Sequence, residues 1–411
     1  MSWDSAAVPS VDRELNRAVD VWSQPLAAAE SSELWDAIVV GAGPAGATAA
    51  LRLGQAGYRV LLIEAKRFPR DKVCGSCLNR RAWSVLVETG LEPEIMRAGA
   101  IELDRMQLIC GRRSAAWSMP TMRAISRRTL DQLLVTAAMQ AGVRFAGETH
   151  ARIASATAGA ESIDVHCRHR AGTEVVVRAR VVIAADGLSH SSLSDIEQAA
   201  SRVARGSRVG LGATLDYDGD GYPIGQLSMI VGAPGYVGVT RVEQGRLNLA
   251  AALSVSVLRT ATSPGAVIEG LLRGSGMEVP LGCREANWVG TPPLTRESGR
   301  WSARRVFLIG DATGYVEPFT GEGMSWALSG AVAVCHFAER AIAHWSDALS
   351  DEWHVVWRKN VRQHQATCRG LAWLLRRPRL SEITLRGVRW TPWLAQWVMR
   401  RAAGPDVSGK P

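Results

Sequence analysis

A glycine-rich turn places the strongest constraint on the fold of this chain. Gly41, Gly43 and Gly46 form a GxGxxG pattern, with Ala45 inside it, directly after the apolar run 37–40. In such a turn the first glycine permits a sharp strand-to-helix reversal and the second lets the backbone approach a pyrophosphate. The third lets the helix pack closely on the strand. The pattern therefore predicts a strand, a phosphate-binding turn and a helix in that order.

An acidic residue follows this turn at the spacing that a dinucleotide requires. The predicted helix 45–55 presents its free N–H groups and positive dipole end to the phosphates. The next apolar run, 60–63, closes with Glu64, which lies 18 residues beyond Gly46. A carboxylate there can accept hydrogen bonds from both hydroxyls of an adenosine ribose and would repel a 2′-phosphate. An ordinary tight turn is the alternative, but strand, helix and acidic residue together favour a dinucleotide-binding βαβ unit.

The bulk properties allow two or three hydrophobic cores that share an interface. The chain has 411 residues, of which 47% are hydrophobic, as in ordinary soluble enzymes. No run approaches the roughly 20 uncharged apolar residues of a spanning helix, and the N-terminus lacks a signal-peptide h-region. We therefore expect a cytoplasmic protein with a mobile leader over residues 1–33, including a short helix around 11–22.

The cysteines indicate neither a disulfide framework nor a metal site. There are seven, an odd number, and only Cys74 and Cys77 have suggestive spacing. A zinc site would need a second ligand pair, and the other five cysteines are scattered singly. A thioredoxin-like redox pair would need to start a helix after a strand, which the residues before Cys74 do not favour.

Positive charge and tryptophan gather at the C-terminus. The formal net charge is +9, and residues 341–411 carry 12 Lys or Arg against five Asp or Glu, together with seven of the 15 tryptophans. Helices of this composition can rest on an anionic membrane surface, which predicts peripheral contact with the inner membrane face. The favoured alternative is that they pack on the protein body with tryptophans inward. Nucleic-acid binding is not expected, because no recognition motif accompanies the charge.

The remaining pattern predicts an α/β protein with a second sheet and C-terminal helices. Helices are expected over 81–88, 126–141, 264–273 and from about 322 to 343. A β-meander is expected over 153–182 and a buried strand over 306–309. The second sheet, glycine-rich and suited to roof a pocket, is expected to contain strands at 211–215, 227–231, 236–241 and 247–253.

Three separated motifs together resemble a known family. The first turn with Glu64, then Asp186-Gly187, then the run 310–323 (GDATGYVEPFTGEG) resemble the FAD-binding set of para-hydroxybenzoate-hydroxylase-like flavoproteins. Within that superfamily the chain is most similar to the geranylgeranyl-reductase group, through Lys72-Val73-Cys74-Gly75 and the run 318–323. Each motif alone is weak, but three in order are a strong signal.

The resemblance implies how FAD would be held. It implies that Gly310-Asp311 reaches the ribityl chain and that Pro318 lies at the flavin face. It also implies that Gly321, Glu322 and Gly323 pass close to the isoalloxazine. Asp186-Gly187 would lie between FAD and the entering reductant, a transiently bound NADPH or NADH. Arg127 matches the arginine that begins the helix bordering the flavin, with Arg128 as an equally placed competitor.

The resemblance also implies a division of the chain. Residues 34–110, 126–190 and 300–345 would form a Rossmann-like FAD-binding domain. Residues 111–125 and 205–299 would form an inserted antiparallel β-sheet substrate domain, and residues 346–411 a C-terminal helical region.

The implied activity is reduction of a C=C bond in a small hydrophobic substrate, isoprenoid or polyketide-like, by hydride from reduced flavin. Cys74, at the family's Cys-Gly position, is the candidate acid; a small residue needed where the loop passes the ring is the alternative. The Trp-containing strand of lipid-reducing relatives is replaced here by 234–239, which leaves isoprenoid specificity open. A monooxygenase is the second candidate and a prenyl-binding escort protein the third. No Trp-x-Trp occurs, which argues against a halogenase.

Overall fold

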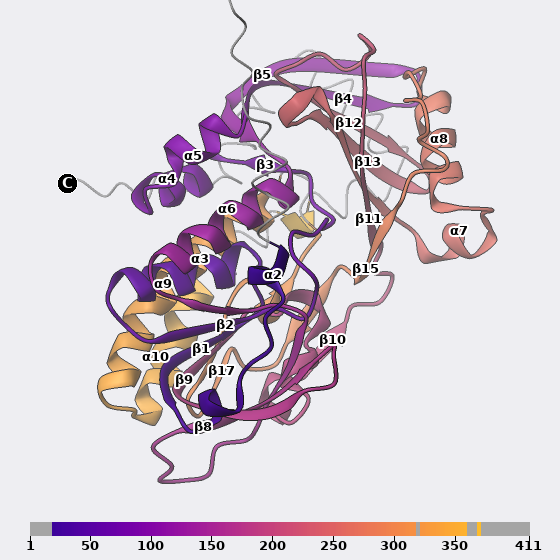
Figure 1. Cartoon of the computed structure of the whole chain (residues 1–411). Helices are drawn as coiled ribbons and strands as arrows, with labels where there is room; N and C mark the ends of the chain where they lie inside the picture. Colours follow the sequence, from indigo (N-terminus) through magenta and orange to yellow (C-terminus); the bar gives the residue numbers. More distant parts are fainter. Residues whose placement is uncertain (1–18, 318–320, 360–367, 371–411) are drawn as a thin grey trace, which may run out of the picture.

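The first sheet occupies the lower body of the molecule in Figure 1, and the glycine-rich turn follows its strand β1. The structure is a computed structural model that describes residues 19–317, 321–359 and 368–370. Strand β1 (Leu34–Val40) lies between β2 (Val60–Ile63) and β9 (Glu174–Ala184), and all three are parallel. The sheet is completed by β6 (Arg144–Ala146), β7 (Thr149–Ile153), β8 (Ile163–His169), β17 (Ser302–Ala303) and β18 (Val306–Leu308).

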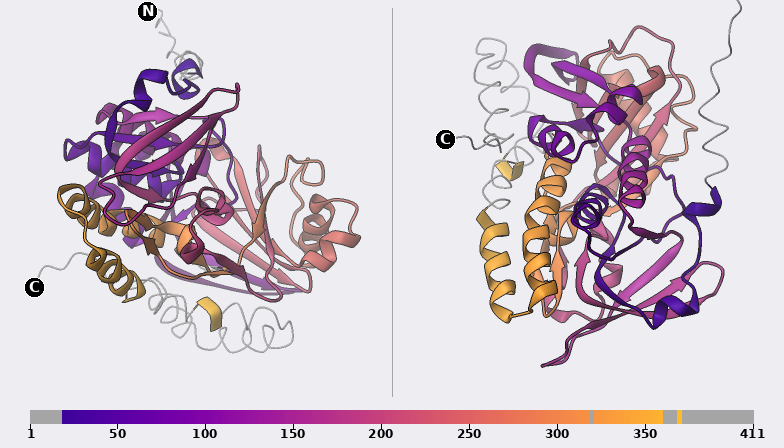
Figure 2. Two further views of the ribbon diagram at one scale, coloured as in Figure 1. Left: turned by 90° about the horizontal axis from the view of Figure 1, so that it is seen from below. Right: turned by 60° about the vertical axis from the view of Figure 1, so that its left-hand side comes forward.

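Both faces of β1 are buried, which explains its continuous apolar run. Ala37 and Val39 face the helical layer, whereas Ile38 and Val40 face the layer that includes β7 and β8. Parallel strands covered on both sides have no polar face to alternate with. The helical layer consists of α3 (Pro44–Gln55), α6 (Arg127–Gln140), α9 (Glu322–Ala343) and α10 (Asp347–Trp357), and Figure 2 shows the last two side by side.

The second sheet stands above the first in Figure 1 and is mostly antiparallel. The exception is the pairing of β4 with β12, which is parallel. In spatial order its strands are β15 (Val289–Pro293), β11 (Val209–Leu215), β14 (Leu247–Leu253), β13 (Gly235–Arg241), β12 (Gln226–Gly232), β4 (Ile101–Cys110), β5 (Arg113–Ala124) and β3 (Cys77–Leu78).

The two faces of the second sheet have different neighbours. The outer face packs on α8 (Pro264–Gly274), with α7 (Val255–Thr260) beside it. The inner face forms a separate apolar cluster that includes Cys77, Leu188 and Tyr315 from outside the sheet's central strands. The inner face is therefore turned toward the ends of the first sheet, where the sequence motifs lie.

Short elements join the two parts. Helices α4 (Arg80–Glu88) and α5 (Glu92–Arg97) follow β3, and a small sheet contains β10 (Ser201–Val203), β16 (Arg296–Ser298) and β19 (Gly314–Tyr315). The motif residues after β9 and β18 form two 3-10 turns, η2 (Gly187–Ser189) and η6 (Gly310–Thr313). Helix α2 (Val19–Trp22) and the 3-10 turns η1 (Ala28–Ser31), η3 (Ser191–Leu193), η4 (Glu197–Ala199) and η5 (Glu243–Gly245) complete the described elements.

A buried carboxylate ties the second sheet to α6. Ser126 caps α6 by accepting a hydrogen bond from the backbone N–H of Thr129. Glu243, in η5 between β13 and β14, accepts hydrogen bonds from the Ser126 N–H and hydroxyl at 2.9 and 2.5 Å and from the Thr129 hydroxyl at 2.6 Å. The start of α6, and Arg127 with it, is therefore held by both parts of the molecule.

The predicted α/β class with a second antiparallel sheet is confirmed, but the mobile leader is wrong for its second half. Trp22 is buried, because its ring stacks on Phe68 at 5.7 Å and meets Phe145 edge-on at the same distance. Leu26 is buried as well. Residues 1–18 lie outside the described residues.

One further expectation differs from the structure. Strand β4, grouped with the FAD-binding part, pairs along β5 and β12 in the second sheet, because its alternate apolar residues face the inner cluster.

In the C-terminal region, Trp345, Trp353 and Trp357 are buried against the helical layer, as the packing alternative expects. The other four tryptophans of that region lie outside the described residues. No described helix has the length and apolar character needed to cross a membrane.

Candidate functional site

The three motifs meet at the carboxyl ends of β1, β9 and β18. Gly41 has φ +102°, and a Cβ there would lie 2.3 Å from the carbonyl oxygen of Ala185. The Ala185 N–H in turn donates to the Val40 carbonyl at 2.7 Å. A Cβ on Gly310 would lie 3.0 Å from the Cβ of Ala45. Backbone from all three motifs is thus in contact at one edge of the sheet.

The glycines of the first turn have separable roles. A Cβ on Gly46 would lie 1.8 Å from the Gly41 carbonyl oxygen, so this glycine serves helix–strand packing. Gly43 caps α3, and a Cβ there would meet only guanidinium nitrogens, of Arg127 at 3.5 Å and of Arg70 at 4.0 Å. The unpaired N–H groups of the first helical turn and two guanidinium groups therefore converge beside Gly43, an arrangement that suits a phosphate.

Glu64 is buried and ionised at the end of β2. Its carboxylate accepts hydrogen bonds from the Ala42 N–H at 3.1 Å, the Lys66 N–H at 3.0 Å and Arg70 at 2.9 Å. Burial opposes its charge, but the charge and hydrogen bond of Arg70 and the two backbone N–H groups outweigh burial and lower its pKa. Glu64 is therefore an anionic acceptor next to the turn, as the sequence predicts.

A fully buried aspartate positions two arginines at the turn. Asp131 accepts a bidentate pair of hydrogen bonds from Arg127, both 2.8 Å, and one from Arg70, also 2.8 Å. Burial opposes the positive charge of Arg127, but Asp131 raises its pKa overall. Arg128, the competing position, instead pairs with Asp71 at 3.5 Å near the surface. Arg127 is therefore the arginine that α6 directs into the site.

The second and third motifs bring two more carboxylates to the site. Oδ2 of Asp186 accepts from the N–H and hydroxyl of Ser192, both at 2.9 Å, while Oδ1 is buried without a partner among the described residues. The side chain of Asp311 makes no hydrogen bond to any described residue, and burial raises its pKa against the charges of Lys72 and Arg127. Gly187 has φ +70° and open space around its Cβ position.

The loop that carries Cys74 contacts the second sheet and packs on the core of the first. Asn248 of β14 donates to the Cys74 carbonyl at 3.0 Å, and a Cβ on Gly212 of β11 would lie 3.1 Å from the Cα of Val73. The Ser76 N–H donates to the Cys74 thiol sulfur at 3.4 Å. Cys74 is half-buried, whereas burial raises the pKa of Cys77 to about 12, so Cys77 is an inert thiol.

A family model described as an FAD binding domain matches residues 35–205. Digeranylgeranylglycerophospholipid reductase 1 of Methanopyrus kandleri is 31% identical over 305 residues, which cover 72% of this chain and 77% of that protein. The chain belongs to the geranylgeranyl-reductase-like family of FAD-dependent oxidoreductases. This confirms the resemblance drawn from the three motifs.

One more sequence relative and one solved structure are similar to this FAD-dependent oxidoreductase. Menaquinone reductase of Mycobacterium tuberculosis is 28% identical over 353 residues, covering 77% of this chain and 80% of that protein. A flavin-dependent brominase has a similar structure, with a TM-score of 0.74 and 16% identity over 90% of this chain and 94% of that one. At that identity the brominase shows a shared fold alone.

The described residues of the oxidoreductase fit FAD. The space beside Gly43 suits the pyrophosphate, Glu64 the adenosine ribose, and the unpartnered carboxylate oxygens of Asp186 and Asp311 suit the hydroxyls of the ribityl chain. Lys72 is exposed to solvent, and its positive charge interacts with the carboxylates of Asp186 and Asp311. These assignments of individual residues remain predictions.

The GEG segment lies where the second sheet meets α9. A Cβ on Gly321 would lie 3.5 Å from the Cβ of Cys77, and Gly323 is half-buried. Glu322 begins α9, is buried, and accepts a hydrogen bond from Asn79 at 3.0 Å. Burial outweighs Arg81 and Asn79 and raises its pKa to about 8. Pro318 lies outside the described residues.

Sequence reasoning missed the charged residues that support the motif residues. Asp131 and Arg70 orient Arg127 and Glu64, and Glu243 holds the start of α6. Glu317 forms a buried ion pair with Arg208 at 3.0 Å. One signal was present, because Asp131 follows Arg127 by four residues and such pairs share a helix face. The other partners are distant in sequence and have no such signal.

Proposed function

We propose that this FAD-dependent oxidoreductase reduces a C=C bond in a hydrophobic, isoprenoid-like substrate, with NADPH or NADH as the source of electrons. The observation that carries the proposal is the 31% identity to the Methanopyrus kandleri reductase named for a digeranylgeranyl lipid, which extends over 77% of that protein. The 28% identity to a menaquinone reductase supports it, because that relative too is named a reductase.

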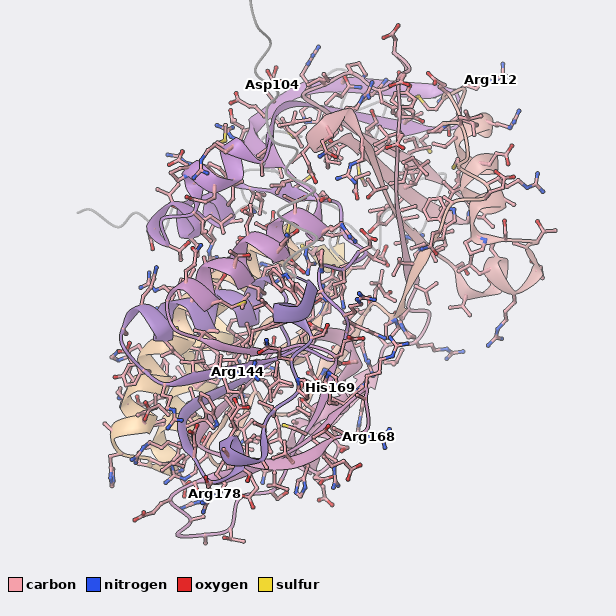
Figure 3. The ribbon with its side chains drawn as sticks, in the orientation of Figure 1. Asp104, Arg112, Arg144, Arg168, His169 and Arg178 are labelled. Carbon is pink, nitrogen blue, oxygen red and sulfur yellow. The ribbon has the colours of Figure 1, made fainter. Side chains whose placement is uncertain are left out.

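The inner face of the second sheet suits a substrate of this kind. It buries the side chains of Met106, Met119, Met122 and Met229 beside Trp117. Methionine is unbranched and polarisable, so a surface rich in it adapts to irregular apolar shapes. Charged side chains such as Asp104 and Arg112 lie at the outer rim of the same sheet in Figure 3. A flexible hydrocarbon chain would therefore find an apolar wall facing the motifs.

The residues around the site would divide the work of the reaction. Bound FAD, once reduced, supplies hydride to an alkene carbon. Arg127 and the first turn of α3 would neutralise the cofactor's phosphates, and the 72–75 loop would close the site toward the second sheet. Cys74, which this loop carries, is the candidate acid that the family resemblance names for the second alkene carbon.

Anaerobic turnover tests the proposal. Purified protein with bound FAD is reduced by NADPH, NADH or dithionite and mixed with polyprenyl lipids and polyprenyl quinones, and products are analysed by mass. The proposal expects a product heavier by two hydrogen atoms and reoxidised flavin without oxygen. If product forms only in air and carries an added oxygen atom, the protein is a monooxygenase. A colourless protein that binds prenyl lipid without FAD would instead be an escort protein.

Membrane contact is a separate part of the proposal. A polyprenyl substrate is held in lipid, and the Trp- and Arg-rich segment after residue 370 has the composition of a peripheral anchor. Sedimentation with anionic and with neutral vesicles tests it. Binding to anionic vesicles that falls with salt supports the contact, and equal recovery in the supernatant with both vesicle types contradicts it.

A further inference from the structure

Tyr315 is a tyrosine of the third motif to which neither the motif nor the family resemblance gave a role. It belongs to β19, directly after the turn that carries Asp311. Its backbone is pinned, because β19 pairs with β16 in a register that sets Tyr315 opposite Arg296. A Cβ on the preceding Gly314 would lie 3.0 Å from the Arg296 carbonyl oxygen, so the two strands approach each other closely at this point.

The phenol ring lies at the boundary between the cofactor motifs and the apolar wall. The Tyr315 side chain packs on the inner-face cluster of the second sheet and remains partly accessible. Asp311, Cys74 and Tyr236 are close enough to affect its charge state. The ring therefore stands between the carboxylate predicted to hold the ribityl chain, the candidate acid, and the surface proposed for the substrate.

The hydroxyl of Tyr315 differs from those of three other tyrosines. Tyr217 donates to Glu278 at 2.8 Å, Tyr222 donates to the Glu278 carbonyl at 2.6 Å, and Tyr236 donates to Glu317. Tyr315 makes no such bond to any described residue. A tyrosine in protein surroundings usually satisfies its hydroxyl. The exception points to a ligand as the partner.

The surroundings keep this hydroxyl protonated. Burial raises the pKa of Tyr315 well above its usual value of 10.0, and the nearby Asp311, Cys74, Tyr236 and Glu317 raise it further. The side chain is therefore a neutral phenol throughout the physiological range, with an O–H group to donate.

We propose that Tyr315, rather than Cys74, donates the proton to the substrate, an inference that rests on the proposed reductase function. In the balanced step the C=C π bond breaks and two C–H bonds form. One carbon receives hydride, for which a nicotinamide supplies the electron pair, and the other receives the phenolic proton. The phenolate then recovers a proton from water.

The test compares three variants in the FAD-loaded protein. Tyr315→Phe removes the hydroxyl alone, and Cys74→Ser tests the competing acid. Tyr222→Phe is the matched control, because it makes the same chemical change on the outer face of the second sheet. Should Tyr315→Phe purify without FAD, Tyr315→Met, which keeps apolar volume, replaces it.

Each variant is reduced anaerobically with dithionite and mixed with the substrate in deuterated water. We expect Tyr315→Phe to slow flavin reoxidation about a hundredfold, the usual scale for loss of a general acid. In this variant we also expect deuterium to enter the alkene carbon that receives the proton without a fixed stereochemistry. Titration with the saturated product should shift the flavin absorption band with unchanged affinity, since the loss is confined to proton transfer. Tyr222→Phe should match the wild type in every measurement.

The outcomes separate this inference from the function on which it rests. Wild-type turnover with a normal rate and stereochemistry in Tyr315→Phe overturns the inference and leaves the reductase proposal intact. A large loss in Cys74→Ser with a normal Tyr315→Phe assigns the proton to Cys74. If the wild type reduces no alkene anaerobically, the reductase function itself fails and the inference fails with it.

Discussion

The two sheets differ in where they carry the residues expected to bind a ligand. In the first sheet, both faces of the central strands are buried, and the groups available to a ligand lie where β1, β9 and β18 end. In the second sheet, the strand ends carry no motif, and the inner face, which we propose as the wall for the substrate, is a buried apolar cluster that gathers residues from several strands. The cofactor is thus expected at a sheet edge and the substrate against a sheet face.

This difference follows from how the strands are ordered. Parallel strands bring their carboxyl ends to one edge, so turns that are distant in sequence meet there. Antiparallel strands expose every second residue on a given face, so a ligand surface gathers single residues from many strands. Cofactor recognition is therefore concentrated in a few short segments, whereas substrate recognition is spread over the sheet.

We expect the largest effects from substitutions in the glycine-rich turn after β1. Gly41→Ala would place a Cβ 2.3 Å from backbone at φ +102°, so we expect the free energy of unfolding to fall by more than about 4 kcal/mol. Gly43→Ala, whose Cβ would meet only guanidinium groups, should change the free energy of unfolding by less than about 0.5 kcal/mol. It should nevertheless weaken FAD binding at least about tenfold, or 1.4 kcal/mol.

Chemical unfolding of the apoprotein and titration with FAD measure the two effects separately. We expect the two effects to fall on different variants: Gly41→Ala loses stability, and Gly43→Ala loses affinity for FAD. Equal losses of apoprotein stability in both variants would show that Gly43 serves the fold and not the ligand.

The second prediction concerns Asp131, the buried carboxylate that orients the arginines beside the glycine-rich turn. Asp131→Asn leaves Arg70 and Arg127 without the carboxylate that accepts from both, and we expect it to destabilise the protein by about 3 kcal/mol. Arg128→Ala is the control, because its pair with Asp71 is exposed and should contribute less than about 0.5 kcal/mol. Unfolding in urea measures both, and similar stabilities for the two variants would contradict a structural role for Asp131.

The same contrast explains how much could be predicted from the sequence. The glycine turn, Glu64, Asp186 and Asp311 lie in contiguous segments with fixed spacing, and the structure brings them together. The helix expected near 322–343 is observed with those bounds, because a long apolar period specifies it locally.

The missed features depend on contacts that no local pattern encodes. Residues 111–125 were assigned to the second sheet's domain, but no strand was predicted at β5, because its residues Ser114 to Met122 mix polar and apolar types without clear alternation. Glu243 reaches Ser126 across 117 residues, and Tyr236 reaches Glu317 across a comparable gap. Such pairs become visible only when the two sheets are in place.

A third prediction tests the face of the second sheet. Met229→Ala removes a buried side chain from the inner face, and we expect the apparent KM for a polyprenyl substrate to change by at least about tenfold. The affinity for FAD should change by less than about twofold, since Met229 belongs to β12 and the predicted cofactor-binding residues lie outside the second sheet. Steady-state kinetics with chains of different length and FAD titration measure both. A loss of FAD without a change in KM would contradict the separation of edge and face.

The last prediction is a pH dependence at the point where edge and face meet. In the folded protein Glu322 keeps its proton to about pH 8, whereas in the unfolded chain it ionises near 4.5. The folded state therefore binds the proton more tightly, and its stability falls as pH rises between these values, by at most about 1.4 kcal/mol per pH unit. Above pH 8 the contribution is constant.

Glu322→Gln removes the titration while an amide remains beside Asn79. Urea unfolding of the apoprotein at pH 6 and pH 8 should show the wild type losing more stability than the variant between the two values. The difference isolates Glu322, because every other titrating group is common to both proteins. Parallel losses would mean that Glu322 ionises in the folded state near its ordinary pKa. In that case the first turn of α9 presents a carboxylate, and not a neutral acid, where the sheet edge meets the substrate face.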